Sequence, residues 1–166
     1  MRILRSVLLL PPLALATLLG SCADSTLGTG IGSGTVLEAT LNGTVISFDL
    51  TDVAGYNTYT IASKETRFGG TSGKTTLTMR LDYDIDQGTF PHTLTGGDIS
   101  IVYIESSGST PLTYDCAIGS DCSVTVTNSN GSIVDGTFHA QLTERSDTTK
   151  KISVTGGTFS VTVARQ

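Results

Sequence analysis

Two cysteines that lie close together carry the most specific chemistry in the sequence. Cys116 and Cys122 enclose only the segment from Ala117 to Asp121. In an oxidising compartment such a pair forms a disulfide. A redox role would favour Cys-x-x-Cys at the start of a helix, and a metal site would need two further soft ligands that the sequence does not offer. The sequence therefore predicts a structural Cys116–Cys122 disulfide.

Three aspartates at alternate positions are the candidates for a cation site. Asp82, Asp84 and Asp86 are followed by Gly88, and alternate oxygen ligands recur in calcium-binding loops. In the helix-loop-helix calcium motif, however, the glycine directly follows the third ligand and a Glu occupies the last position, where this chain has Thr93. Apolar residues alternate with the aspartates, which places the carboxylates on a solvated strand face. We expect no metal site and no cofactor, and weak calcium binding by these three residues is left open.

Catalysis through a Ser-His-Asp arrangement would require one of the two histidines, His92 or His139. Neither lies in a catalytic motif, and the sequence has no Gly-x-Ser-x-Gly elbow, P-loop or dinucleotide fingerprint. His92 follows Pro91 in an expected turn, and His139 alternates with apolar neighbours, so we expect both imidazoles at the surface. No acidic pair stands out as acid and base. We therefore expect no catalytic residues and no enzyme.

The five tyrosines are candidates for lining a pocket, since a tyrosine combines an apolar ring with a hydroxyl that donates a hydrogen bond. They are Tyr56, Tyr59, Tyr83, Tyr103 and Tyr114. The alternation of apolar and polar residues around them predicts that most pack in the core or at its rim. A ligand-lining role is left open as the alternative.

Strands must position these residues, because apolar residues from position 35 onward recur with a period of two, which is typical of half-buried strands. The pattern is clear over Leu37–Leu41, Leu77–Tyr83 and Phe159–Val163, and no segment predicts a helix. Asn42-Gly43 predicts a hairpin, since a type I′ turn needs positive φ at both central residues. The apolar run Ile99–Ile104 is predicted to be buried on both faces. The fold class is all-β: a single antiparallel β-sandwich or barrel of about eight to ten short strands.

The N-terminus predicts export. Residues 1–21 combine a positive start, a short apolar run and small residues before Cys22, which is the arrangement of a signal peptide and too short for a membrane span. The ending Leu19-Gly20-Ser21-Cys22 resembles the lipobox of bacterial lipoproteins. This resemblance implies that the chain is cut before Cys22 and that acyl chains on this cysteine anchor it to a membrane. An ordinary secretory signal is the alternative.

The predicted chain has three parts. Residues 1–21 form a lipoprotein signal peptide, residues 22–34 a lipid-anchored flexible Gly/Ser/Thr tether, and residues 35–166 an antiparallel β domain. Ala23 rather than Asp after the lipobox cysteine implies, by the lipoprotein sorting rule, the outer membrane of a Gram-negative cell. The predicted location is therefore the bacterial cell envelope, with the outer membrane favoured over the inner.

Two C-terminal segments carry a wider resemblance. Gly136–Leu142 and Ile152–Val161, together with an earlier Asn-Gly hairpin, resemble strands of small all-β lipoproteins of Gram-negative envelopes that contain a domain of unknown function. The resemblance covers roughly Ser123 to Val163 and its motifs are ordinary hairpin chemistry. It implies an all-β fold, and it carries over no activity and no functional residue.

The charge excludes a nucleic-acid-binding surface, because phosphate contacts need clustered Lys and Arg. The chain has 10 Lys+Arg against 15 Asp+Glu and a formal net charge of −5. The tether, the Thr-rich strand faces and the missing catalytic motifs favour a lipid-anchored, non-catalytic binding or structural module for an envelope protein or glycan. The alternative is a carrier of a small apolar ligand in a β-barrel pocket.

Overall fold

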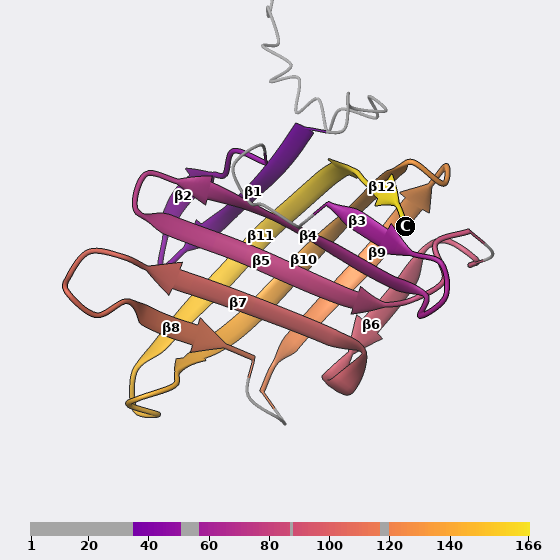
Figure 1. Cartoon of the computed structure of the whole chain (residues 1–166). Coiled ribbons are helices and arrows are strands. Elements are labelled where there is room, and N and C mark those ends of the chain that lie inside the picture. Colours follow the sequence, from indigo (N-terminus) through magenta and orange to yellow (C-terminus); the bar gives the residue numbers. More distant parts are fainter. Residues whose placement is uncertain (1–34, 51–56, 87, 117–119) are drawn as a thin grey trace, which may run out of the picture. The chain divides into compact units, whose positions relative to one another are not determined.

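The computed structural model describes residues 35–50, 57–86, 88–116 and 120–166 (Figure 1). The predicted signal peptide, Cys22 and the tether lie outside the described residues, as does Tyr56. The described part of the chain consists of strands, turns and one short 3₁₀ segment, without an α-helix. Within these ranges no helix has the length and apolar character needed to cross a membrane.

Twelve strands follow one another along the part of the chain that the structure describes. They are β1 (Thr35–Leu41), β2 (Thr44–Ser47), β3 (Thr58–Thr60), β4 (Glu65–Ser72), β5 (Thr75–Asp82), β6 (His92–Thr95), β7 (Ile99–Glu105), β8 (Leu112–Asp115), β9 (Cys122–Ser129), β10 (Ile133–Glu144), β11 (Lys151–Thr162) and β12 (Ala164–Arg165), with the 3₁₀ segment η1 (Gly96–Asp98) before β7. The pairing is antiparallel except between β12 and β3, which are parallel.

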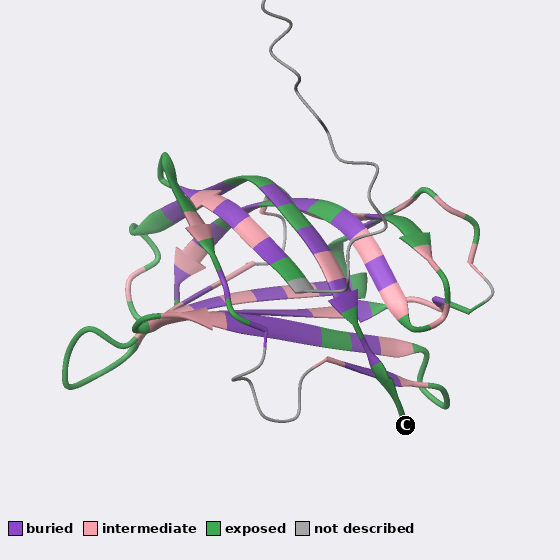
Figure 2. Cartoon of the chain, turned by 90° about the horizontal axis from the view of Figure 1, so that it is seen from above, coloured by how far each residue is buried: buried purple, intermediate pink, exposed green. Residues whose placement is uncertain are grey.

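The strands form one continuous sheet that folds over into two facing layers. Along the hydrogen-bonded path the order is β12-β3-β4-β5-β7-β8-β10-β11-β1-β2, and β9 and β6 branch from β10. In Figure 1, β4, β5 and β7 cross in front of β9, β10 and β11, and Figure 2 shows the two layers from above. We call β3, β4, β5, β7 and β8 the front layer and β6, β9, β10, β11 and β1 the back layer.

The long strand β10 joins the layers because it pairs with different strands along its length. Thr143 and Glu144 pair with β8, whereas Val134–Ala140 pairs with β9. Elsewhere Asp49, just after β2, forms an isolated bridge with Thr71 of β4. The path of described strands still has ends at β12 and β2, so the sheet is not closed into a barrel. The predicted all-β class is confirmed, with twelve strands instead of about eight to ten.

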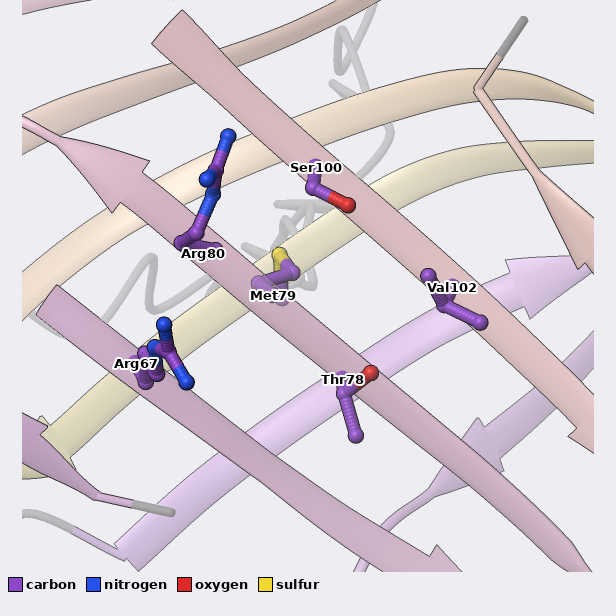
Figure 3. A pocket seen from close by; sticks show the side chains of 6 residues that line it. All are labelled: Arg67, Thr78, Met79, Arg80, Ser100 and Val102. Carbon is purple, nitrogen blue, oxygen red and sulfur yellow. The ribbon is translucent and has the colours of Figure 1, made fainter.

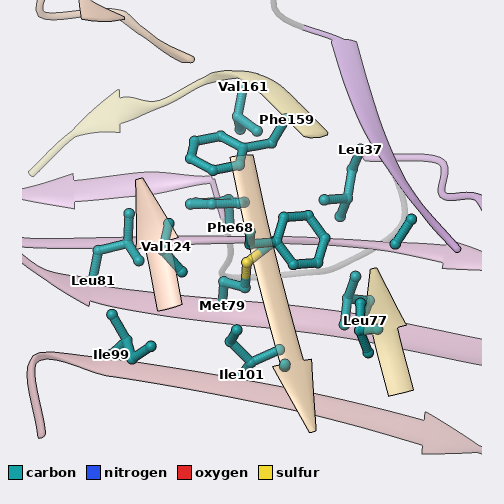
Figure 4. Packing of buried hydrophobic residues seen from close by; sticks show 14 of the residues in the cluster. Leu37, Phe68, Leu77, Met79, Leu81, Ile99, Ile101, Val124, Phe159 and Val161 are labelled. Atoms are coloured by element: carbon teal, nitrogen blue, oxygen red, sulfur yellow. The ribbon is translucent and has the colours of Figure 1, made fainter. Parts of the chain in front are cut away.

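The inward-facing side chains of both layers meet in one hydrophobic core (Figure 4). Phe68 of β4 and Phe159 of β11 face each other across the core, with ring centroids 4.7 Å apart. Buried and exposed residues alternate along most strands, as the colours of Figure 2 show. Each fully buried aliphatic or aromatic side chain stabilises the fold by about 1.5 to 3 kcal/mol. Packing between the layers is therefore the main source of stability.

The hairpin predicted at Asn42-Gly43 is confirmed. Asn42 has φ of 47° and Gly43 has φ of 87°, and β1 and β2 pair on either side of them. The Asn42 side chain also accepts a hydrogen bond of 3.0 Å from the backbone N–H of Ser153 in β11. The turn thus fixes the register of β1 and β2 and also holds β11, the neighbour of β1 in the sheet, in position.

The prediction that Ile99–Ile104 is buried on both faces is wrong. Ile99, Ile101 and Tyr103 are buried, but Ser100 and Val102 are only half-buried. The reason is that β7 lies in a layer that packs on the core with one face only, so alternate residues meet solvent. The outward side chains of this strand contribute to a surface depression described below.

Candidate functional site

The predicted disulfide is confirmed: Cys116 and Cys122 are bonded, with Cα atoms 6.3 Å apart. Cys116 directly follows β8 of the front layer, and Cys122 begins β9 of the back layer. The bond therefore connects the two layers covalently. Because disulfides of this kind persist in oxidising compartments, it indicates an extracytoplasmic location for the protein.

A β-bulge interrupts β11 in the back layer. Phe138 of β10 pairs with Gly157 and Ala140 pairs with Val154, so β11 has one extra residue between these pairs. A register shift also occurs where β11 pairs with β1. Gly156 lies in the bulge with φ of 57°, a backbone conformation that glycine adopts at little cost. A bulge bends its strand and re-aims the neighbouring side chains.

Beside this bulge the outer face of the back layer contains a recess of about 230 Å³, which we call the bulge recess. It is lined by Asp121, His139, Ala140, Gln141, Ser153, Val154 and Thr155. The lining residues are exposed except for Ala140 and Val154, which are buried. The exposed side chains all carry hydrogen-bonding groups. The recess therefore offers donors and acceptors to a ligand, beside apolar surface of similar extent.

Ser123, His139 and Asp121 are linked by hydrogen bonds at the rim of the bulge recess. Ser123 Oγ lies 3.0 Å from His139 Nδ1, and His139 Nε2 lies 3.1 Å from Asp121 Oδ1. Ser123 and His139 are direct cross-strand partners on β9 and β10. Asp121 is held beside them because its carbonyl accepts a 2.9 Å hydrogen bond from the backbone N–H of Gln141. The fold thus fixes the orientation of the imidazole at the surface.

The connectivity matches that of a nucleophile, a base and an orienting acid, but the described residues of β9 supply no backbone oxyanion donors from the face of the sheet. Backbone N–H groups of β9 lie in the plane of the sheet, between β6 and β10, and do not project from its face toward an oxyanion. The side chains of His139 and Asp121 are 51% and 85% exposed. The arrangement therefore presents an imidazole and a carboxylate to solvent at the rim of the recess.

A row of four threonines crosses the same face. Thr93, Thr125, Thr137 and Thr158 are successive cross-strand neighbours on β6, β9, β10 and β11. The hydroxyls of Thr93 and Thr125 lie 2.9 Å apart. Because adjacent strands are about 4.8 Å apart, the row presents hydroxyl groups at a regular spacing. We call it the threonine row, and it lies two residues along the strands from Ser123 and His139.

The outer face of the front layer contains a second depression, of about 370 Å³, which we call the arginine groove (Figure 3). It is lined by Arg67 of β4, by Thr78, Met79 and Arg80 of β5, and by Ser100 and Val102 of β7. The two depressions lie on the outer faces of different layers. They are therefore separate candidate sites.

The aspartates considered for calcium face different cations. Asp84 lies 2.5 Å from Lys64 Nζ, Asp86 pairs with Arg165, and Asp82 lies 3.5 Å from Arg80. Among the described residues, no three His, Cys, Asp or Glu side chains come together in a way that could hold a metal ion. Calcium binding at Asp82, Asp84 and Asp86 would require these ion pairs to open.

The described tyrosines pack against the protein itself. Tyr59, Tyr103 and Tyr114 are buried in the core, whereas Tyr83 is half-buried and stacks on His92 with ring centroids 4.3 Å apart. Burial raises the pKa of Tyr59 to about 12, helped by its hydrogen bond to Asp84. Neither the bulge recess nor the arginine groove has a tyrosine in its lining. His92 begins β6 and is half-buried, while His139 is exposed as predicted.

Sequence reasoning does not find the cluster around His139, because it depends on the register of one hairpin. A two-residue turn at Asn130-Gly131 would place Ser123 opposite Phe138. In the structure Ser129 pairs with Val134, and a register shift follows between Asp135 and Gly136. These two irregularities bring Ser123 opposite His139. The exposed position of His139 on an alternating strand was the signal available, and it did not identify the partners.

No protein-family model, no curated protein and no solved structure matches this chain. The function is therefore inferred from the residues and geometry of the chain itself.

Proposed function

We propose that the protein is a non-catalytic glycan-binding module of the bacterial cell envelope, and that it binds through the bulge recess and the threonine row. The observation that carries the proposal is the lining of the recess. Its exposed side chains are Asp121, His139, Gln141, Ser153 and Thr155. They supply a carboxylate, an imidazole, an amide and two hydroxyls, and this set can both donate to and accept from sugar hydroxyls.

The proposed site is held in position before a ligand arrives. Ser123 and Asp121 orient His139, and the disulfide at Cys122 fixes the residue next to Asp121. Preorganised polar groups lose less side-chain freedom on binding, which favours affinity. The threonine row extends the hydrogen-bonding face beyond the recess. We therefore expect affinity to rise with the length of the saccharide.

The proposed location rests on the N-terminus. We infer that Cys22 is acylated and anchors the protein in the outer membrane, as the lipobox resemblance implies, and the disulfide supports export. The test is the Cys22→Ala variant. It should be lost from the membrane fraction after salt washing, and the denatured mass of the wild-type chain should include the acyl chains. Retention of Cys22→Ala in the membrane would contradict the anchor.

The alternative of an apolar-ligand carrier has less support. Such a carrier needs an enclosed apolar pocket, whereas the described sheet is not closed into a barrel. The two depressions described above are lined largely by polar residues on outer faces. The inward-facing aromatic rings pack on one another, as for Phe138 and Phe159 with centroids 6.4 Å apart.

Co-sedimentation with insoluble envelope polysaccharide tests the glycan proposal. Full-length protein in detergent is incubated with purified cell-wall sacculi and then pelleted. Ser153→Tyr places a ring in the bulge recess and should lower the bound fraction strongly. Thr113→Tyr is the matched control, because Thr113 lies on β8 in the front layer, paired with Ile104, and it should bind like wild type.

Three results would overturn the proposal. The first is equal sedimentation of Ser153→Tyr and wild type, and the second is no sedimentation of either. The third is hydrolysis of an aryl ester that disappears in Ser123→Ala, which would make the Ser123–His139–Asp121 cluster catalytic. Far-UV circular dichroism of each variant confirms that the sheet is retained.

A further inference from the structure

The arginine groove owes its shape to three neighbouring strands. Arg67 of β4 pairs with Arg80 of β5, and Arg80 pairs with Ser100 of β7. In the next row Gly69 pairs with Thr78. A Cβ on Gly69 would lie 2.7 Å from the carbonyl oxygen of Leu77, so the position has no room for a side chain. The absence of a side chain beside the two arginines lowers the surface there.

Two arginines directly opposite each other repel unless an anion lies between them. Glu65 supplies part of this compensation: it accepts a hydrogen bond from Arg67 Nε, and its other oxygen lies 3.8 Å from Arg80. Glu65 is only 15% exposed, whereas Arg67 and Arg80 are 51% and 39% exposed. The Glu65 carboxylate is thus largely buried beside the two guanidinium groups, which remain partly exposed. Asp82 lies 3.5 Å from Arg80 on the same face.

One nitrogen of the Arg80 guanidinium lies beneath the surface of the groove. Arg80 Nε is buried and has no hydrogen-bond partner among the described residues. A buried donor without an acceptor is costly. Beyond the arginines, the lining continues with Thr78, Ser100 and Val102, as Figure 3 shows. The groove therefore combines two guanidinium groups, flanked by the carboxylates of Glu65 and Asp82, with hydroxyl groups and one aliphatic side chain.

We propose that the arginine groove binds a carboxylate-bearing sugar, a uronate residue. The carboxylate would lie against the exposed edges of Arg67 and Arg80, because a planar guanidinium matches a carboxylate with two parallel hydrogen bonds. Sugar hydroxyls would meet Thr78 and Ser100, and a C–H face would lie on Val102. The volume of about 370 Å³ is in the range of small-ligand sites, which begin at roughly 300 Å³.

This inference is independent of the proposed glycan site, which lies on the outer face of the other layer. If both hold, the domain contacts saccharide on two opposite faces. Failure of the groove proposal would leave binding to the bulge recess untouched. The two are separated experimentally because Ser153→Tyr changes only the recess and Arg80→Gln changes only the groove.

The test uses full-length protein in detergent and a tetrasaccharide of galacturonate, followed by isothermal titration at low salt. Arg80→Gln should weaken binding about tenfold or more, since it removes charge-assisted hydrogen bonds. Arg80→Lys keeps the charge but loses the planar fork, so it should recover only part of the affinity. Arg145→Gln is the control, because Arg145 is exposed and pairs with Asp115 outside the groove. It should bind like wild type.

Further arms decide the ligand class. A neutral cellulose tetrasaccharide should bind much more weakly than the galacturonate tetrasaccharide. Acetate should compete with the galacturonate carboxylate for the arginines. Ser100→Ala should weaken galacturonate binding but leave this competition by acetate unchanged. The proposal is overturned if the neutral sugar binds equally well, if Arg80→Gln and Arg145→Gln bind alike, or if no binding is detected. It is also overturned if inorganic phosphate displaces the tetrasaccharide at equal concentration, since the groove would then be a general anion site.

Discussion

Asp84 accepts hydrogen bonds from two residues that are distant from it in the sequence. Tyr59 Oη donates to one carboxylate oxygen over 3.0 Å, and Lys64 Nζ to the other over 2.5 Å. The hydrogen bond from Lys64 is the main reason that the pKa of Asp84 falls to about 2. The carboxylate therefore stays charged in the folded protein at pH values where it would become protonated in the unfolded chain.

The lowered pKa of Asp84 predicts a loss of stability in acid. Its contribution is complete above the ordinary aspartate pKa of about 3.9, and it is lost as the pH falls through the folded value of about 2. Asp84→Asn should be less stable than wild type at pH 6, and the difference should shrink between about pH 4 and pH 2. Urea unfolding at several pH values measures this. Two parallel stability curves would contradict the prediction.

Prediction from sequence was least complete for the contacts between individual side chains. Alternation identifies His139 as exposed and Leu77, Met79 and Leu81 as inward-facing, and the structure agrees. The partners of exposed polar residues depend on which strands become neighbours and in which register. A shift of one residue in the hairpin would have separated Ser123 from His139. Periodicity gives the face on which a side chain lies, but not the side chain opposite to it.

At the scale of elements, the two adjacent glycines of β11 have different structural roles. Gly156 has φ of 57° and would have no close contact from a Cβ except Thr40 at 3.9 Å. Gly157 has ordinary φ, but a Cβ there would lie 2.6 Å from the Phe138 ring. The first glycine allows the backbone turn of the bulge, and the second makes room for a core aromatic side chain.

Substituting these glycines should therefore have separable effects. Gly156→Ala should destabilise the protein by about 1 kcal/mol through backbone strain alone. Gly157→Ala should cost about 1 to 3 kcal/mol, because Phe138 must move within a packed core. Gly73→Ala is the control for strain: Gly73 has φ of 60° with nothing within 4 Å. Chemical denaturation gives the free energies, and near-UV circular dichroism should change only for Gly157→Ala.

A Gly157→Ala variant as stable as Gly73→Ala, with an unchanged near-UV spectrum, would contradict the role assigned to Gly157. The paired glycines also explain why the apolar alternation does not run continuously through β11. The alternation of Ile152 and Val154 continues in Phe159 and Val161 only after one extra residue. The bulge accommodates that residue, and so both segments face the core in a single strand of 12 residues.

Other strands lack a local sequence signal for related reasons. β4 contains Gly69 and Gly70, which interrupt the apolar alternation although both are buried. β6 and β8 have four residues each, too few to establish a period. In contrast, the clear alternation around Leu77 to Leu81 and the Asn42-Gly43 turn are local signals, and the structure has a strand and a hairpin there. Local signals therefore predicted β5 and the hairpin, whereas β4, β6 and β8 depend on their neighbours in the folded sheet.

For the whole molecule, the connection between layers is the critical feature. The Cys116–Cys122 bond joins the end of β8 to the start of β9. Removing it in a Cys116→Ser, Cys122→Ser double variant should lower the free energy of unfolding by about 2 kcal/mol, because a loop of about seven residues is no longer closed in the unfolded chain. Urea unfolding under non-reducing conditions measures the loss.

The same double variant tests how the disulfide supports the bulge recess. Asp121 precedes Cys122, so its position beside His139 should become less fixed, and NMR resonances of the His139 ring should broaden or shift. Resonances of His92, which stacks on Tyr83, provide the internal control and should keep their positions. Unchanged His139 resonances together with full stability would contradict the role of the disulfide.

Arg165 holds the C-terminal strand β12 in place through three contacts. Arg165 in β12 donates to the carbonyl of Gly131 over 2.8 Å, pairs with Asp86, and lies over the Tyr59 ring with its Cζ 5.7 Å from the centroid. These partners come from three separate segments. Arg165→Gln should lower Tm and speed hydrogen exchange in β3 and β12 before other strands. Arg145→Gln is the matched control, and equal exchange in both variants would contradict this fastening.

An open sheet also has consequences for self-association. Unpaired strand edges can template the addition of another chain, and long, flat, apolar edges promote aggregation. Here the path of described strands ends at β2, with four residues, and at β12, with two, while β6 ends the branch with four. Val45 in β2 is 62% exposed, so this edge is the most apolar of those named. Short edges offer few backbone groups to an added strand, which disfavours edge-to-edge association between copies of the domain.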